Sequence, residues 1–211
     1  MQTQALDQEL DGPNDSQIDG RTARRDRNRD AVLDAVIELF TEDSLVPGAA
    51  EVAKRSGVSP RSVYRYFEDI DDLIRAATDR HFESIRPLFV IKGIGRGPLD
   101  ERTETIVSLR LHLFEVIAST MRASLALARS NELMRERMFH NRQLLRQQIE
   151  LQFAPELDAM STTVARDVTA AIDVLLGFES IEHLRRHREL PGPAARRVLV
   201  RAVSAMFATT D

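Results

Sequence analysis

The stretch of sequence that decides the fold is Glu51-Val-Ala-Lys-Arg-Ser-Gly-Val-Ser-Pro-Arg-Ser-Val-Tyr-Arg-Tyr-Phe67. It predicts two short helices joined by a turn at residues 57–59. Gly57 ends the first helix, because glycine is the residue that most readily takes the left-handed conformation found after a helix. Ser59 begins the second, because its hydroxyl caps free backbone N–H groups and the proline that follows loses nothing by lacking one.

The second helix is expected to run from Pro60 to about Tyr66, with one face turned inward. Val63 and Phe67 lie one helical turn apart and should point into the core together with Val58. The residues left outside are rich in hydrogen-bond donors: Arg61, Ser62, Tyr64 and Arg65. Two short helices of this kind are what a helix-turn-helix requires, with the second helix reading the major groove of double-stranded DNA.

Each outward residue has an expected role on DNA. Arg61 can bond a guanine edge in a bidentate way, and Ser62 is a short donor or acceptor. Tyr64 and Tyr66 can each place a hydroxyl on a phosphate, and Arg65 can serve either role. The predicted DNA-binding residues are Ser59, Pro60, Arg61, Ser62, Tyr64, Arg65 and Tyr66, with Arg24 and Arg25 added from the chain before them.

The residues before this motif divide into a tail and a helix. Residues 1–20 hold five acidic residues and no Lys or Arg, and we expect a disordered acidic tail. From about Thr22 a helix should run to about Thr41, because one apolar stripe follows it. The stripe consists of Val32, Ala35, Val36, Leu39 and Phe40.

Charge is distributed unevenly along the 211 residues, whose formal net charge is −4. Residues 21–66 hold nine basic residues against seven acidic ones. A local basic excess therefore lies where the DNA-binding residues are expected, although the average over the whole chain is acidic.

The rest of the chain also predicts helices and no strand. Asp69 can cap a fourth helix that Pro87 ends or kinks, and a flexible connection follows at Gly93, Gly95, Gly97 and Pro98. A long helix should come next, then helices over about 131–153 and 161–188, and a last one after the turn at 190–193. The predicted fold is all-α with about nine helices: residues 1–20 as tail, 21–67 as helix-turn-helix domain, and 68–211 as a helical effector-binding and dimerisation domain.

Composition excludes several kinds of site. The chain has no cysteine, which excludes disulfides and thiolate chemistry. Without a long apolar run or a basic N-terminal segment, we expect a cytoplasmic protein that does not enter membranes. His183 and His187 have a spacing that can hold a metal, with Glu179 a turn earlier, but neighbouring arginines disfavour a cation. No catalytic set of side chains is recognisable, so neither an enzyme nor a cofactor is predicted.

The residues of the 51–67 stretch, with the acidic residues and Leu73-Ile74 after it, resemble the DNA-binding head of the TetR family of transcriptional regulators. The resemblance covers about residues 22–75. It departs from the family at Pro47 and Gly48, where a capping Thr is usual, and at Ile70, where a phosphate-contacting Lys is common. The arginines of residues 21–29 can compensate by lying along the DNA backbone or entering the minor groove.

The resemblance implies a repressor that a small-molecule effector releases from a palindromic operator, and a homodimer formed by the last two long helices. The predicted interface residues are Ala171, Leu175, Gly177, Val198, Ala202 and Met206, with Gly177 placed in the middle of a helix. A small apolar or amphipathic ligand is expected among Phe82, Phe89, Phe114, Met121, Met134, Met138 and Phe139.

Two other hypotheses remain open at this point. In one, the chain is a ligand-binding or enzymatic helical bundle whose head does not read DNA. In the other, it is a regulator without a small-molecule effector, controlled by a protein partner or by its abundance. Salt-dependent DNA binding separates the first from a regulator.

Overall fold

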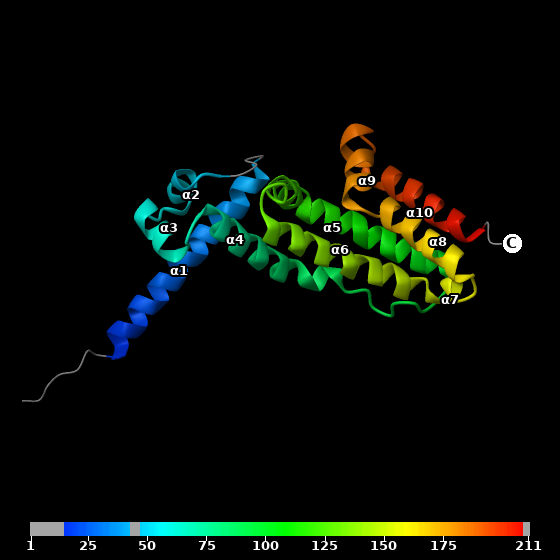
Figure 1. Ribbon diagram of the computed structural model, residues 1–211, viewed down its shortest axis with the longest axis horizontal. Coiled ribbons are helices and arrows are strands. Elements are labelled where there is room, and N and C mark those ends of the chain that lie inside the picture. Colours follow the sequence, from blue (N-terminus) through cyan, green and yellow to red (C-terminus); the bar gives the residue numbers. More distant parts are fainter. Residues whose placement is uncertain (1–14, 43–46, 209–211) are drawn as a thin grey trace, which may run out of the picture. The chain divides into compact units, whose positions relative to one another are not determined.

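The structure is a computed structural model that describes residues 15–42 and 47–208. Most of these residues are helical and no strand is found among them, so the predicted all-α class is confirmed (Figure 1). The helices are α1 (Asp15–Thr41), α2 (Ala49–Ser56), α3 (Pro60–Tyr66), α4 (Ile70–Ile85), the 3-10 helix η1 (Arg86–Phe89), α5 (Leu99–Leu127), α6 (Glu132–Gln152), α7 (Ala154–Leu157), α8 (Thr162–Leu175), α9 (Phe178–Glu182), the π-helical turn η2 (His183–His187) and α10 (Gly192–Ala208).

The described chain forms two compact units. The first, called the head below, holds residues 15–39 and 47–77, and the second, called the body, holds residues 40–42 and 78–208. The boundary therefore falls inside α4, ten residues later than the end of the domain expected at residue 67.

The head is held together by the apolar residues that the sequence pattern places inside. The stripe of α1 is buried, and so are Val58, Val63 and Phe67 around α3. Leu73, Ile74 and Ala77 of α4 are buried as well. Each buried Val or Leu stabilises the fold by roughly 1.5–3 kcal/mol, so these residues supply the apolar core on which the short helices pack.

The turn between α2 and α3 forms by the mechanisms expected from its residues. Gly57 has φ 69°, in the left-handed region, and ends α2. Ser59 accepts a hydrogen bond from the backbone N–H of Ser62 at 3.3 Å, with Pro60 at the first helical position. Asp69 likewise accepts from the N–H of Asp72 at 2.7 Å. By contrast, the N-cap residue of α2 is Gly48, which has no side chain to cap the helix.

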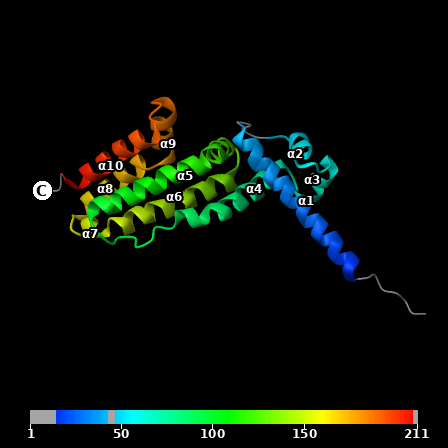
Figure 2. The ribbon, with the colours of Figure 1, turned by 180° about the vertical axis from the view of Figure 1, so that it is seen from behind.

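The body is a bundle in which α5, α6, α8 and α10 lie side by side (Figures 1 and 2). Its core is built from large apolar residues of all four helices, among them Ile106, Ile149, Ile172 and Leu199. The rings of Phe114 and Phe178 meet at 5.3 Å between centroids, and those of Phe153 and Phe207 meet at 4.9 Å.

A buried polar cluster ties the connection before α5 to the end of α6. Arg102 forms an ion pair with Glu156 and also donates to the backbone oxygen of Gly97 at 3.0 Å. Gln152 donates to the backbone oxygen of Arg102 at 2.8 Å and accepts from the N–H of Gly95 at 3.1 Å. Because every one of these groups has a partner, the cluster can be buried at little cost.

Two expectations about helix limits are wrong. Helix α1 begins at Asp15 rather than near Thr22, so residues 15–20 of the expected tail are helical, while residues 1–14 lie outside the described part of the chain. The helix expected over residues 161–188 is divided into α8, α9 and η2.

The division of that helix occurs at Gly177, which is extended with ψ 155° and precedes the first residue of α9. A Cβ at this position would lie 3.2 Å from the backbone oxygen of Asp173 and 3.3 Å from that of Val174. Gly177 therefore lies at a break between two helices, with backbone close to it, and the expectation of a small residue in the middle of a helix is wrong.

No helix in the described ranges is both long and apolar enough to cross a membrane.

Candidate nucleic-acid interface and body cavity

The outward face of α3 is exposed and carries the donors expected of it. Arg61, Tyr64 and Arg65 are exposed, and 60% of the surface of Tyr64 is accessible. Ser62 and Tyr66 are half-buried, and Ser59 and Pro60 at the helix start are exposed. The seven predicted residues of this segment therefore lie on one short helix and its cap.

Arg65 is held in place by its neighbours on α3. Its guanidinium donates to the hydroxyl of Tyr66 at 3.1 Å and to the hydroxyl of Ser62 at 3.5 Å. It also lies over the ring of Tyr66, 5.1 Å from the centroid. A positioned arginine loses less side-chain entropy on meeting a phosphate or a base edge than one that moves freely.

The phenol of Tyr66 has a lowered pKa, mainly because Arg65 donates to its oxygen. A hydrogen bond with Asn28 and the positive charges of Arg65 and Arg25 act in the same direction, while burial acts against them. Because Asn28 and Arg25 belong to α1, the basic part of α1 and the end of α3 lie close together within the head.

A second contact joins the same two helices. The guanidinium of Arg29 lies over the ring of Phe67, 5.3 Å from its centroid. On α2, Arg55 pairs with Glu38 of α1 at 3.4 Å. These contacts fix α2 and α3 against α1, so the donors of α3 are carried by a small packed unit.

The predicted arm residues Arg24 and Arg25 are both exposed on α1. The structure brings Arg25 near Tyr66, whereas no contact of the described residues places Arg24 at α3. Together with Arg21, Arg27 and Arg29, they give this part of α1 a basic surface. Such a surface is complementary to the phosphate backbone of DNA.

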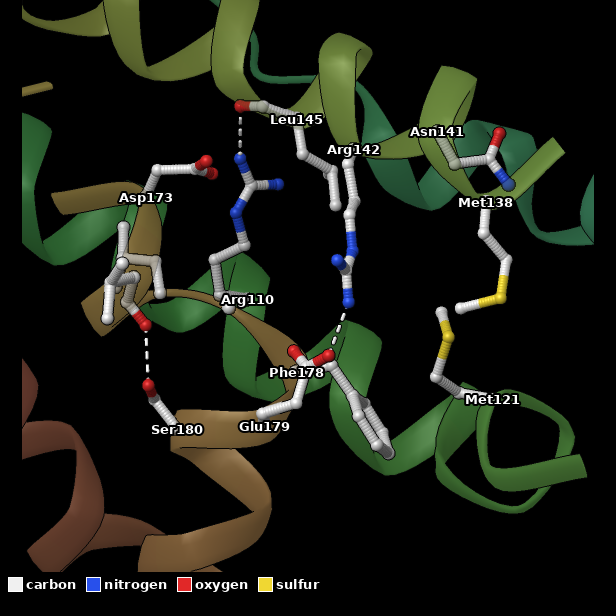
Figure 3. A pocket seen from close by; sticks show the side chains of 13 residues that line it. Arg110, Met121, Met138, Asn141, Arg142, Leu145, Asp173, Phe178, Glu179 and Ser180 are labelled. Carbon is white, nitrogen blue, oxygen red and sulfur yellow. Dashed lines mark hydrogen bonds and ion pairs between the residues drawn. The ribbon is translucent and has the colours of Figure 1, made fainter. Parts of the chain in front are cut away.

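The body contains a cavity of about 280 Å³ between α5, α6, α8 and the start of α9 (Figure 3). Arg110 and Asp173 lie at one end of it, and Met121, Met138 and Asn141 lie at the other (Figure 3). Arg142 of α6 and Glu179 of α9 also line it and form an exposed ion pair between these two ends (Figure 3). The further lining residues are Leu145, Val174, Leu176, Gly177, Phe178 and Ser180.

The two ionisable residues at one end of the cavity, Arg110 and Asp173, have pKa values that depart from their ordinary ones. Burial lowers the pKa of Arg110 to about 10, and the negative charge of Asp173 opposes this effect. Burial raises the pKa of Asp173, while the charges of Arg110, Arg146 and Arg142 lower it. Arg110 nevertheless remains charged at neutral pH, because its pKa stays well above 7.

Of the seven predicted ligand residues, the cavity brings together Met121 and Met138. Phe114 is buried against Phe178, and Met134 is 3% exposed in the interior. Phe139 is 63% exposed and points away from the core, and Phe82 and Phe89 are half-buried. None of these five lines the cavity.

The cavity is also lined by residues that the sequence did not predict, namely Arg110, Asn141, Asp173 and Phe178. The position of Arg110 could have been noticed in the sequence. It lies four residues after Ile106 and four residues before Phe114, and so within an apolar stripe of the helix. A charged residue in such a stripe is buried at a cost, which makes it a candidate for function. Phe178 had no such signal, since its position depends on the break at Gly177.

The predicted dimer residues lie on α8 and α10, except Gly177, which lines the cavity. Val198 is 45% exposed, whereas Leu175 and Met206 pack partly against the core of the same chain. Ala171 and Ala202 are half-buried. Val164 and Val174 add further exposed apolar surface on α8, at 39% and 69%.

Comparison with known proteins agrees with the geometry of the head. Residues 32–77 match the family model of bacterial regulatory proteins, tetR family. The match covers the buried stripe of α1, all of α2 and α3, and the first half of α4. No curated protein matches the chain.

Proposed function

We propose that the chain is a homodimeric repressor that a small molecule releases from a palindromic operator. Its residues 32–77 match the family model of bacterial regulatory proteins, tetR family, which supports a DNA-binding transcriptional regulator. The observation that carries this proposal is the exposed donor face of α3 on a head that matches the family. The cavity in the body supplies a place for the effector.

In this proposal α3 enters the major groove. Arg61 reads a guanine edge, Ser62 and Arg65 contact bases or phosphates, and Tyr64 and Tyr66 donate to phosphates. Ser59 and Pro60 bring the start of the helix close to the backbone of the DNA. Arg24 and Arg25 lie on the adjacent backbone or in the minor groove, which offsets the missing phosphate contact at Ile70.

A second copy of the chain is part of the proposal. With only seven residues, α3 can contact few base pairs, and useful specificity needs two heads on a two-fold axis. The exposed apolar residues of α8 and α10, such as Val174 and Val198, favour these helices as the dimer interface. The other interface residues in this proposal are Ala171, Leu175, Ala202 and Met206.

Release by a ligand requires that the ligand bind one conformation of the dimer better than the other. Helix α4 is the coupling element in this proposal, because it runs from the head into the body without a break. A ligand that shifts α4 changes the spacing of the two heads, and heads spaced wrongly for successive major grooves leave the DNA. A regulator of this kind acts in the cytoplasm, where the DNA is.

The test begins with selection of bound fragments from genomic DNA by the purified full chain. The selected fragment and a shuffled version of it are then compared in a mobility-shift titration at several salt concentrations. We expect at least a thousandfold preference for the selected fragment and a steep loss of affinity with salt. Equal binding to both fragments, or no binding at low salt, would refute the proposal.

A further inference from the structure

Arg110 of α5 is a buried charge without an ion-pair partner among the described residues. It is 4% exposed, and its guanidinium donates to two uncharged groups, the backbone oxygen of Leu145 and the side-chain oxygen of Gln148, both at 2.8 Å. The other equally buried arginine, Arg102, forms an ion pair with Glu156. Arg110 therefore retains N–H groups and a charge that the chain does not neutralise directly.

A buried charge of this kind is costly unless an anion compensates it. Asp173 acts on Arg110 through its charge, but the two side chains form no ion pair, and burial outweighs the effect of Asp173 on the pKa of Arg110. Arg142 and Arg146 also act on Asp173, and Glu179 is a second carboxylate that does so. Two of the three arginines already have ion-pair partners: Arg142 pairs with Glu179, and Arg146 pairs with Glu150 at 3.5 Å. Arg110 is therefore the arginine of the three that an incoming anion can pair with.

The end of the cavity away from Arg110 suits an apolar group. Its wall away from Arg110 is formed by Met121, Met138 and Phe178, and methionine adapts well to ligands of irregular shape. At the same end, the side-chain nitrogen of Asn141 is buried without a hydrogen-bond partner. A volume of about 280 Å³ lies at the lower limit for small-molecule sites, so the ligand must be small.

We propose that the cavity binds a small organic acid, whose carboxylate pairs with the guanidinium of Arg110 and whose apolar body lies between Met121 and Met138 (Figure 3). An arginine can bind a carboxylate through two parallel hydrogen bonds, which a neutral amide of the same shape cannot match. That this acid is the effector rests on the proposed function, which assigns effector binding to the cavity. The chemical class of the effector is the new part.

The experiment uses matched pairs of probes, phenylacetate with phenylacetamide and hexanoate with hexanamide. The full chain carries six methionines, so labelling their methyl carbons gives few NMR signals, which single Met→Leu variants assign. We expect both acids to shift the signals of Met121 and Met138 and to leave that of Met206, on α10, unchanged. Each amide should bind at least tenfold more weakly than its acid.

Two variants test the role of Arg110. Arg110→Met removes the charge and keeps most of the volume, and it should abolish the preference for acid over amide. Arg122→Gln is the control, because Arg122 lies on the same helix but pairs with Glu182 at 3.2 Å and does not line the cavity. This variant should bind the acids as the parent chain does.

Several results would overturn the inference: acids and amides that bind equally to the parent chain, no shift with any probe at millimolar concentration, or an acid preference that survives in Arg110→Met. The comparison of acid with amide in the parent chain does not depend on how well the variant folds. Binding to the selected DNA fragment is measured on the same samples. If the chain binds the DNA fragment but no acid, this inference is wrong and the proposed DNA binding stands. If it binds acids but no DNA, the proposed function is wrong and the cavity still binds acids.

Discussion

At the scale of single residues, Arg61 and Tyr64 share one exposed face of α3 but differ in what they can recognise. Arg61→Ala should reduce the preference for the selected fragment by about 1–3 kcal/mol, because a bidentate contact to guanine is lost. Tyr64→Phe should weaken binding to selected and shuffled fragments alike, because it removes a phosphate contact. Mobility-shift titrations of both variants on both fragments measure the difference.

Arg135→Ala is the control for the loss of a positive charge, since Arg135 is an exposed arginine of α6 in the body. It should leave both affinities unchanged. If Arg61→Ala lowers the affinities for selected and shuffled DNA by the same factor, Arg61 does not read a base.

Tyr66 offers a prediction about pH. In Tyr64→Phe it is the single tyrosine of the chain, so phenolate absorbance follows it alone. Because the hydrogen bond from Arg65 favours the phenolate, absorbance should rise at a pH below the ordinary midpoint of about 10. Adding Arg65→Ala should move the midpoint upward, and an unchanged midpoint would show that Arg65 does not act on the phenol.

Arg110 also has a consequence for stability. Its folded-state pKa is lower than its unfolded one, so its charge opposes folding at neutral pH, and this opposition disappears only above pH 10. Arg110→Met should therefore unfold at the same temperature as the parent chain or at a higher one, by scanning calorimetry at pH 7. A loss of more than about 1 kcal/mol would mean that the bonds to Leu145 and Gln148 outweigh the cost of burying the charge.

At the scale of elements, the turn between α2 and α3 depends on the backbone of Gly57. Gly57→Ala should destabilise the head by about 1–2 kcal/mol, because a side chain is strained at φ 69° although no atom lies within 4 Å of the added Cβ. Gly20→Ala is the matched control, since Gly20 has equally open surroundings but lies inside α1. Circular dichroism on heating should show a loss for the first and none for the second.

Helices were more predictable from the sequence than the places where they are interrupted. Ser59, Asp69 and Gly57 act locally, so their effects on α2, α3 and α4 follow from neighbouring residues alone. The start of α1 and the break at Gly177 do not. Residues 15–20 have a composition typical of a tail, and a single glycine within an apolar helical pattern, such as Gly177, does not show by itself whether the helix breaks there.

The same distinction applies to the two sites. The interface on α3 lies within one short segment, so the sequence places its residues together. The cavity gathers side chains from α5, α6, α8 and α9, and only the packing of the bundle decides which of them meet. The sequence therefore named Met121 and Met138 together with five residues that do not line the cavity, and it did not name Asp173 or Phe178.

At the scale of the whole molecule, the proposed dimer makes the affinity for DNA depend on α10. Val198→Glu places a charge on a residue that is 45% exposed in the single chain, so the fold should tolerate it while the dimer should not. We expect a monomer by light scattering and at least a tenfold loss of affinity for the selected fragment. Leu133→Glu is the control, since Leu133 is 59% exposed on α6.

Helix α9 affects how selectively the cavity binds its ligands. It has five residues and supplies Phe178 and Glu179 to the cavity, whereas Arg110 projects from the 29-residue helix α5. A short helix that follows a break in the chain shifts more readily than a long packed helix. The protein should therefore be strict about the charge of an inducer and tolerant of its bulk, so that one regulator answers to a series of homologous compounds.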